Sequence, residues 1–400
     1  MMKKLLVLFF ISSFFFSCSN RQTAKYPDKG HYIIDLDGNK EEAIPYSSLF
    51  KNVQTIILET GEDCMIGSIN ELQVFNGYIY ILDKPIAKSL FVFDMKGRFI
   101  RKIGSLGNGP GEYIQIKDFT VDTENGFIFL QDEGTRVHKY QLDGTYVHSI
   151  SIQTPRSNSY FIQFYKGILY ASVIAWDPAE DDYMLLGIDP NDGKILSRLL
   201  PLKYNKGWAE ASFTGNFFMS RLSNPPKYTQ LFMGSVVSLD EEISPYIELK
   251  SKNLVTEKDL ENLPEGSMSI MEKLSHFQRS SKIWNVHNLV ENDDFLLFSY
   301  ESGMLDFFTV VFHKETKTVN IAKQLSNNMV LKADDMRSGM PGKFAFSDAQ
   351  GAYEIVPTFA MSRFLESIRN NKLVPDLDKL DQLKKLDEES NPVIFFYEFK

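Results

Sequence analysis

Residues 102–132, KIGSLGNGPGEYIQIKDFTVDTENGFIFLQD, form the stretch that decides the fold. The pattern predicts a strand that ends at Ile103, then a crossing, then two strands at 118–121 and 127–130 joined by a turn. The crossing is rich in glycine and contains Gly104, Gly107, Gly109, Pro110 and Gly111. Because glycine adopts positive φ at little steric cost, this composition indicates a tight change of direction. A phosphate-binding loop would be followed by a helix, and here strands follow.

The same order of strands and turns recurs at intervals of nearly fifty residues. Asp83 and Asp132, which each end a strand, are 49 residues apart. The turn residues Gly97, Gly144 and Gly193 are 47 and 49 residues apart. Looser units follow, and the chain is long enough for six. A repeat of this length with several strands per unit is typical of propeller blades, which are small twisted sheets packed in a ring. The sequence therefore predicts an all-β fold, a six-bladed β-propeller.

Two insertions have helical patterns, near 256–281 and 361–389. In the first, Thr256 is a candidate N-cap, and the apolar residues fall mainly three or four apart. The second insertion is interrupted at Pro375. Its later half carries a leucine stripe at Leu377, Leu380, Leu383 and Leu386. We expect this stripe to be helical and to pack on its own domain rather than bind a partner.

The two ends of the chain each offer one further strand, at 53–59 and 393–399. A propeller has to join its first and last blades, because a free edge strand presents unpaired backbone groups and invites aggregation. We predict that both strands lie in the sixth blade, where the amino-terminal strand completes the sheet.

The first residues have the pattern of an export signal. Lys3 and Lys4 precede an apolar run at 5–16, which is short for a bilayer span but typical of a signal peptide. Ser17 directly before Cys18 resembles the lipobox of bacterial lipoproteins, in which the signal is removed and the cysteine is lipidated. The alternative is an ordinary secretory signal with a coincidental cysteine.

The lipobox pattern divides the chain into three parts. We expect a signal peptide at 1–17, a lipidated Cys18 with a tether through residue 30, and one propeller domain at 31–400. The predicted location is the cell envelope, with the protein anchored to the membrane. The tether lacks an acidic cluster, which favours a periplasm-facing position.

Composition limits the function classes. A formal net charge of −9 argues against a dominant nucleic-acid role. Only Cys64 remains after Cys18, so acylation of Cys18 leaves no intrachain disulfide, and we expect Cys64 to be a packed thiol. The six histidines have no metal-ligand spacing, and no catalytic serine or zinc motif occurs. We predict no metal, no cofactor and a monomer.

Several segments carry a family resemblance. GNGPGEY (107–113), DFTVD (118–122), IFLQD (128–132) and RVHKYQLDG (136–144) resemble an NHL-type repeat. With the end segments 44–60 and 391–400, they resemble the six-bladed β-propeller lipoprotein family of Gram-negative bacteria. That resemblance implies an architecture, because the family has no well-established common activity.

Four residues are candidates for ligand binding. Glu112 either offers a carboxylate to the central channel or accepts hydrogen bonds from loop amides, and Tyr113 either joins it or packs between blades. Trp176 and Trp208 lie in loops that could line a sugar or peptide site, or they pack in the core. Asp132 and Arg136 flank a tight turn, where an ion pair that locks the hairpin is the favoured role.

The function favoured by these patterns is a binding module for a glycan, a peptide or a partner protein. The alternative is a hydrolase or lyase with its site in the central channel, because propellers host both kinds of function. A cluster of histidine, carboxylate and arginine around the channel would favour the enzyme.

Overall fold

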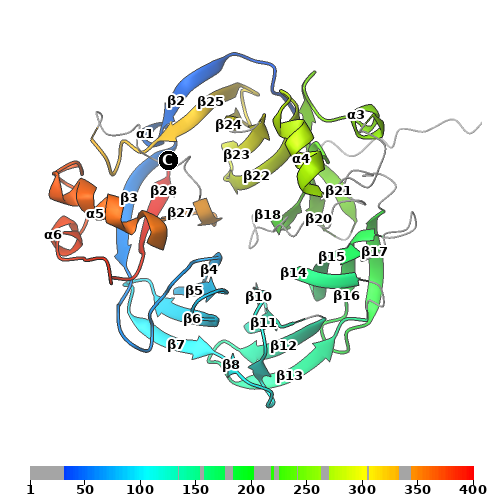
Figure 1. The fold of residues 1–400 in the computed structure, drawn as a ribbon, viewed down its shortest axis with the longest axis vertical. Helices are drawn as coiled ribbons and strands as arrows, with labels where there is room; N and C mark the ends of the chain where they lie inside the picture. Colours follow the sequence, from blue (N-terminus) through cyan, green and yellow to red (C-terminus); the bar gives the residue numbers. More distant parts are fainter. Residues whose placement is uncertain are drawn as a thin grey trace, which may run out of the picture.

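A computed structural model describes most of the chain. The described residues are 31–133, 135–153, 157–175, 183–201, 218–219, 225–240, 242–262, 270–303, 306–332 and 344–400. Within them, six sheets of four or five strands follow one another around a ring (Figure 1). The predicted six-bladed β-propeller is confirmed.

The first three sheets are antiparallel meanders that run from the ring centre outwards. The first contains β4 (Glu71–Phe75), β5 (Tyr78–Asp83), β6 (Ser89–Asp94) and β7 (Phe99–Ile103). The second contains β10 (Asp118–Asp122), β11 (Phe127–Gln131), β12 (Arg136–Gln141) and β13 (Tyr146–Ser151). The third contains β14 (Ser157–Tyr165), β15 (Ile168–Ala175), β16 (Tyr183–Ile188) and β17 (Ile195–Pro201). Their middle strands are rich in β-branched and aromatic residues, which suits a sheet buried on both faces.

The last three sheets combine carboxy-terminal strands with strands from the amino terminus. The fourth contains β18 (Phe218–Met219), β19 (Lys227–Tyr228), β20 (Ser235–Leu239) and β21 (Ile243–Lys250). The fifth contains β22 (Ile283–Glu291), β23 (Phe295–Ser302), β24 (Asp306–His313) and β25 (Val319–Ser326). The sixth contains β26 (Phe344–Ser347), β27 (Gly351–Ile355) and β28 (Val393–Phe399).

The amino-terminal segment lies along the outside of these three sheets. β1 (Tyr32–Asp35) pairs in parallel with β21, and β2 (Lys40–Pro45) pairs in parallel with β25. After the short helix α1 (Tyr46–Leu49), β3 (Phe50–Ile57) pairs antiparallel with β28 and completes the sixth sheet. The predicted pairing of the two terminal strands is confirmed, whereas β1 and β2 are additions that the sequence analysis did not place in any blade.

Two repeated contacts explain why the spacing of the units is nearly constant. Asp83 accepts hydrogen bonds from the backbone of the loop that enters its sheet, at Gly67 N–H (2.8 Å) and Ser68 N–H (3.0 Å). Asp132 does the same one unit later, at Ile114 N–H (2.9 Å) and Gln115 N–H (2.8 Å). Each aspartate therefore fixes the path of the chain between two sheets.

The turn glycines allow neighbouring sheets to approach. Gly97 has a φ of +83°, and a Cβ built on it would lie 2.0 Å from the carbonyl oxygen of Ile57 in β3. Gly193 makes the equivalent approach to Ser151 of β13, with a built Cβ 2.3 Å from its carbonyl oxygen. A larger residue at either turn would push two blades apart.

The two predicted insertions contain short helices. Thr256 caps α3 (Glu257–Glu261) in a capping box with Asp259, as expected. The other helices are α4 (Ile270–Gln278), α5 (Met361–Arg369) and α6 (Leu380–Leu383). The expected helix along the leucine stripe is wrong beyond this one turn, since Lys379 has a left-handed φ of 55° just before it. Leu377 and Leu383 nevertheless pack in the core between the fifth and sixth sheets, so the stripe serves its own domain.

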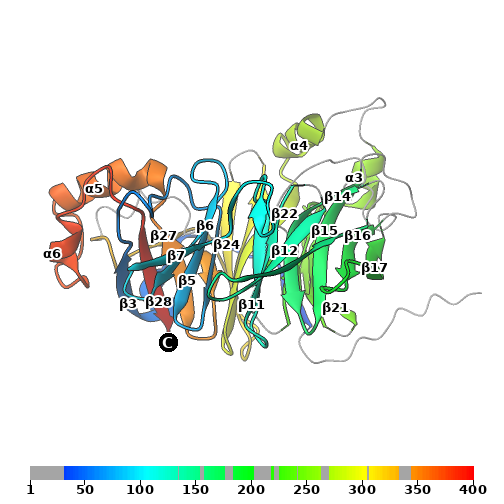
Figure 2. The same ribbon diagram turned by 90° about the horizontal axis from the view of Figure 1, so that it is seen from below.

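The two faces of the ring differ in character. In an antiparallel meander, connections alternate between the two ends of the sheet. The connections from one sheet to the next therefore share an end with the loops between second and third strands, and we call this end the loop face. It carries α3, α4, α5 and α6, and Figure 2 shows α4 and α5 opposite the carboxy terminus. The opposite end, the hairpin face, carries short turns. No helix in the described residues is long and apolar enough to cross a membrane.

Candidate functional site

A cavity of about 890 Å³ extends from the inner strands of the ring to α5. Its walls come from the inner strands β4, β18, β22 and β26, from β27, and from the segment around α5. Phe359, which is 75% exposed, and the exposed Arg363 belong to this segment and mark its outer rim. The volume lies within the range of pockets that hold small ligands or parts of larger ones, roughly 300–1,000 Å³.

The lining combines aromatic rings with a small set of polar groups. The aromatic residues are Tyr46, Phe218, Phe307, Phe344, Phe346, Phe359, Phe364 and Phe395. The titratable polar residues are Glu71, Glu301, Glu354, His287 and Arg363. Rings supply contact area and faces for stacking, while a few placed polar groups supply orientation.

Glu354 of β27 is the most constrained polar group in this lining. Its Oε1 accepts a hydrogen bond from the Tyr46 hydroxyl at 3.0 Å. Its Oε2 accepts from the Tyr397 hydroxyl at 2.8 Å and from Asn327 Nδ2 at 3.1 Å. Asn327 Nδ2 also lies 2.6 Å from the Tyr397 hydroxyl, so the group is a closed network. These residues come from α1, the segment after β25, β27 and β28, which only the assembled ring brings together.

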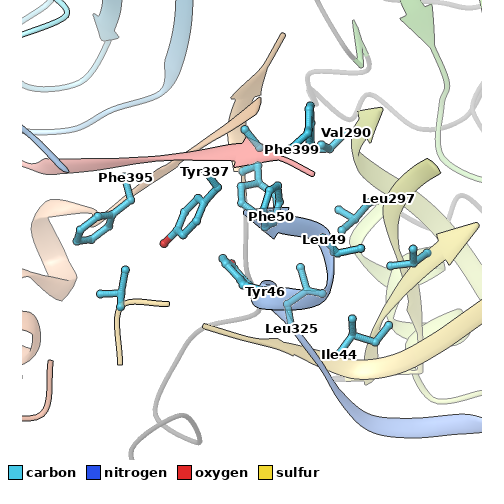
Figure 3. Close-up of a cluster of buried hydrophobic side chains, with 14 of the residues drawn as sticks. Ile44, Tyr46, Leu49, Phe50, Val290, Leu297, Leu325, Phe395, Tyr397 and Phe399 are labelled. Atoms are coloured by element: carbon cyan, nitrogen blue, oxygen red, sulfur yellow. The ribbon is translucent and has the colours of Figure 1, made fainter. Parts of the chain in front are cut away.

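The rings around Glu354 are packed tightly. Figure 3 shows Tyr46 and Phe50 of the amino-terminal segment beside Tyr397 of β28. The centroid of the Tyr46 ring lies 5.0 Å from that of Tyr397 in an edge-on arrangement. Both tyrosines are fully buried, and burial together with the Glu354 charge raises the pKa of each well above its ordinary value. Each therefore keeps its proton and remains a hydrogen-bond donor.

Burial raises the pKa of Glu354, and its three donors oppose that effect without cancelling it. All three donors are neutral groups. Among the described residues, no lysine, arginine or histidine forms an ion pair with Glu354.

A second polar group lies on the fifth sheet. His287 of β22 and Glu301 of β23 lie on neighbouring strands, with His287 Nε2 3.3 Å from Glu301 Oε1. Asn285 Nδ2 donates to the same oxygen at 2.9 Å. Sequence patterns did not reveal this pair, because β22 was not recognised as a strand. The alternation of Asn285 and His287 on one face of a strand is the signal that could have found it.

Glu112 and Tyr113 lie at the junction between the first and second sheets and do not line the cavity. Strand β9 (Glu112–Tyr113) pairs in parallel with β8 (Ser105–Leu106). Glu112 Oε2 accepts from Gly109 N–H at 2.8 Å, and the buried Tyr113 donates to the Lys88 carbonyl at 3.0 Å. These contacts match the structural role considered for both residues.

The glycines of the crossing differ in whether the backbone conformation requires glycine. Gly111 has a φ of +77°, and a Cβ built on it would lie 2.8 Å from Tyr146. Gly109 is not in the left-handed region, and a Cβ there would meet only the Glu112 carboxylate, at 3.0 Å. Backbone strain therefore applies to Gly111 and not to Gly109.

Asp132 and Arg136 form the expected ion pair across their hairpin, at 2.8 Å. Burial alone would raise the pKa of Asp132, but backbone N–H donors, His138 and Arg136 hold it below its ordinary value. His138 lies 3.4 Å from Asp132 and 2.7 Å from Ser149 Oγ. A pairing with His148 does not occur, because His148 is opposite Lys139 and so lies on the other face of the sheet.

The remaining sequence-based candidates divide into two groups. Trp176, Trp208 and Cys18 lie outside the described residues. Cys64 is buried, its Sγ lies 3.3 Å from the Glu59 carbonyl oxygen, and burial raises the pKa of its thiol, as expected for a packed cysteine. Within the described part of the chain, no group of three or more His, Cys, Asp or Glu side chains is arranged to hold a metal ion.

Known proteins share this architecture. A family model described as a domain of unknown function, DUF4934, matches residues 31–398. A Bacteroides fragilis protein provisionally described as exported has a similar solved structure, with a TM-score of 0.65 at 16% identity over 93% of this chain and 99% of its own. A DUF4221 family member from Bacteroides vulgatus has a TM-score of 0.51 at 12% identity over 88% of this chain and 97% of its own. No curated protein matches this chain.

Proposed function

The chain belongs to the DUF4934 family, and we propose that it is a cell-envelope binding module that takes part of a glycan, a peptide or a partner protein into the cavity described above. The observation that carries this proposal is the cavity itself. About 890 Å³ remains unfilled between strands whose other faces are closely packed. Aromatic rings with a few oriented polar groups are the lining that binding pockets use.

An envelope location is supported by the amino-terminal sequence and by the exported description of the Bacteroides fragilis neighbour. We place Cys18 as the lipidated residue and 18–30 as the tether. Tyr32, the first residue of β1, packs edge-on against Phe312 of the fifth sheet, at 5.4 Å between centroids. Lys317, in a hairpin turn of that sheet, lies 5.2 Å from the Tyr32 ring. A tether that leads into β1 would join the propeller near the hairpin face, and the loop face would then point away from the membrane.

The proposal is tested by filling the cavity. Ala345 of β26 lines it, so Ala345→Trp should occupy it, whereas Ala43→Trp on β2 places the same ring outside it. The full-length protein, purified in detergent, is immobilised and screened on glycan and peptide arrays. We expect hits that Ala43→Trp retains and Ala345→Trp loses. Hits that survive Ala345→Trp would place binding elsewhere, and an absence of hits would refute binding of these two ligand classes.

One observation favours the second candidate, a hydrolase or lyase. The cavity contains the His287–Glu301 pair, and a carboxylate can orient a histidine that moves protons. Turnover of nitrophenyl glycosides or nitrophenyl esters by the wild-type protein, lost in His287→Ala, would support it. Wild-type protein that turns over neither series would remove this candidate for both bond types.

A further inference from the structure

We propose that Glu354 is the recognition group of the cavity and that it binds a primary alkylammonium group, the chemistry of a lysine side chain or an alkylamine. This inference rests on the proposed function, because it assigns a ligand chemistry to the same cavity. It follows from the number of acceptor positions left on Glu354, from the charges around it, and from the apolar rings beside it.

The hydrogen bonds of Glu354 leave one acceptor position. A carboxylate offers about four lone-pair positions, two on each oxygen. Oε2 accepts from both Tyr397 and Asn327, and Oε1 accepts from Tyr46 alone. The remaining position is therefore on Oε1, and Glu354 is part of the cavity lining. The three donors hold the carboxylate in one orientation, so less conformational entropy is lost when a ligand binds to it.

Within the described part of the chain, no cation forms an ion pair with Glu354. The partly buried Glu291, in the same ring, has two cations beside it. Its carboxylate oxygens lie 3.8 Å from Lys227 Nζ and 3.8 Å from Lys314 Nζ. Glu354 has three neutral donors instead, within the described part of the chain. Because an unpaired buried charge is costly, the site favours either a proton or a ligand cation on this carboxylate.

The single open position selects among cations. A guanidinium group binds a carboxylate best through two parallel hydrogen bonds, which need an open position on each oxygen. An ammonium group is a compact charge with three donors, and one of them can reach the carboxylate through a single open position. Phe344, Phe364 and Phe395 also line this end of the cavity, and Phe364 packs edge-on against Phe395 at 5.9 Å. Such rings suit an alkyl stem and attract a cation to their faces.

The same arrangement makes binding depend on pH. The ammonium group competes with a proton for Glu354, whose pKa burial raises above its ordinary value. Tyr46 and Tyr397 keep their protons throughout this range, and Asn327 does not titrate. A lysine-type amine stays protonated up to about pH 10. Affinity should therefore rise as pH increases through the pKa of the empty site.

The experiment measures binding of small probes by calorimetry to the full-length protein in detergent. Nα-acetyl-lysine methylamide is the test probe, and its Nε-acetylated form is the matched neutral control. Nα-acetyl-arginine methylamide tests the preference for ammonium, and glucosamine against N-acetylglucosamine tests a sugar as the source of the amine. We expect the lysine probe to bind at least tenfold more tightly than its Nε-acetylated form, with affinity that rises with pH. Glu354→Gln should abolish both the preference and the pH dependence.

The controls separate this inference from the proposed function. Equal binding of the two lysine probes, or an unchanged preference in Glu354→Gln, would overturn the assignment of Glu354 while leaving array hits in the cavity intact. A lysine probe that still binds Ala345→Trp would instead contradict the cavity as the binding site. If glucosamine bound and the lysine probe did not, the inference that the ammonium group is carried on an alkyl stem would be wrong. Glu398→Gln, outside the cavity, should keep the preference, and melting curves confirm that each variant is folded.

Discussion

Removal of residues 391–400 tests how the ring is closed. β28 lies between β27 and β3, so its loss leaves β3 without a partner and exposes one edge of β27, which stays paired with β26. Six of its apolar side chains are buried: Val393, Ile394, Phe395, Phe396, Tyr397 and Phe399. At about 1.5–3 kcal/mol for each, their burial stabilises the fold by roughly 9–18 kcal/mol as an upper bound. That range covers the whole net stability of a typical domain, about 5–15 kcal/mol.

We therefore expect the truncated chain to be unfolded or aggregated, as judged by circular dichroism and size-exclusion chromatography. Deletion of the exposed Lys400 alone is the control and should leave the melting curve unchanged. Ile394→Ala gives a graded version, because it hollows a fully buried site and should cost about 2–5 kcal/mol. A truncated protein that stays monomeric with an unchanged melting temperature would refute the role of β28 in closure.

Three other predictions address the anchor, the crossing and Glu354. Cys18→Ala should abolish incorporation of labelled fatty acid, and a variant that still labels would contradict the lipoprotein assignment. Gly111→Val should lower stability by roughly 1–3 kcal/mol in chemical denaturation, because it forces a left-handed φ on a branched residue, whereas Gly109→Ala should cost less; equal effects would contradict the distinction. The folded-state pKa of Glu354 is raised, so the wild-type protein should lose stability relative to Glu354→Gln as pH rises from about 4.5 through that pKa. Parallel profiles of unfolding free energy against pH for the two proteins would contradict the burial of this carboxyl.

The local sequence was sufficient to predict the blades where the repeat is regular. Asp83 and Asp132 accept from loop amides, and Gly97 turns against the preceding sheet, so each position keeps its residue type and its spacing. The pairing of β3 with β28 was also predictable, because an open ring would leave two unpaired edges.

The cavity was not predictable from local patterns. Glu354 is one of 52 acidic residues, and nothing in its neighbours along the chain distinguishes it. Its environment depends on Tyr46, Asn327 and Tyr397, of which Tyr46 is 308 positions away. The parallel pairing of β1 and β2 was not predicted for the same reason, since their partners lie in distant repeats.

The outer amino-terminal strands have a consequence for how the chain folds. Tyr32 pairs with Ile247, Lys40 with Ile321, and Phe50 with Phe399, so each of these early strands pairs with a strand that is made much later. Contacts of such high sequence separation slow folding, because loop-closure entropy is lost before they form. β1, β2 and β3 stay unpaired until β21, β25 and β28 respectively have been made, and a chaperone would protect them during this interval. Completion of the fold is thus coupled to completion of the chain.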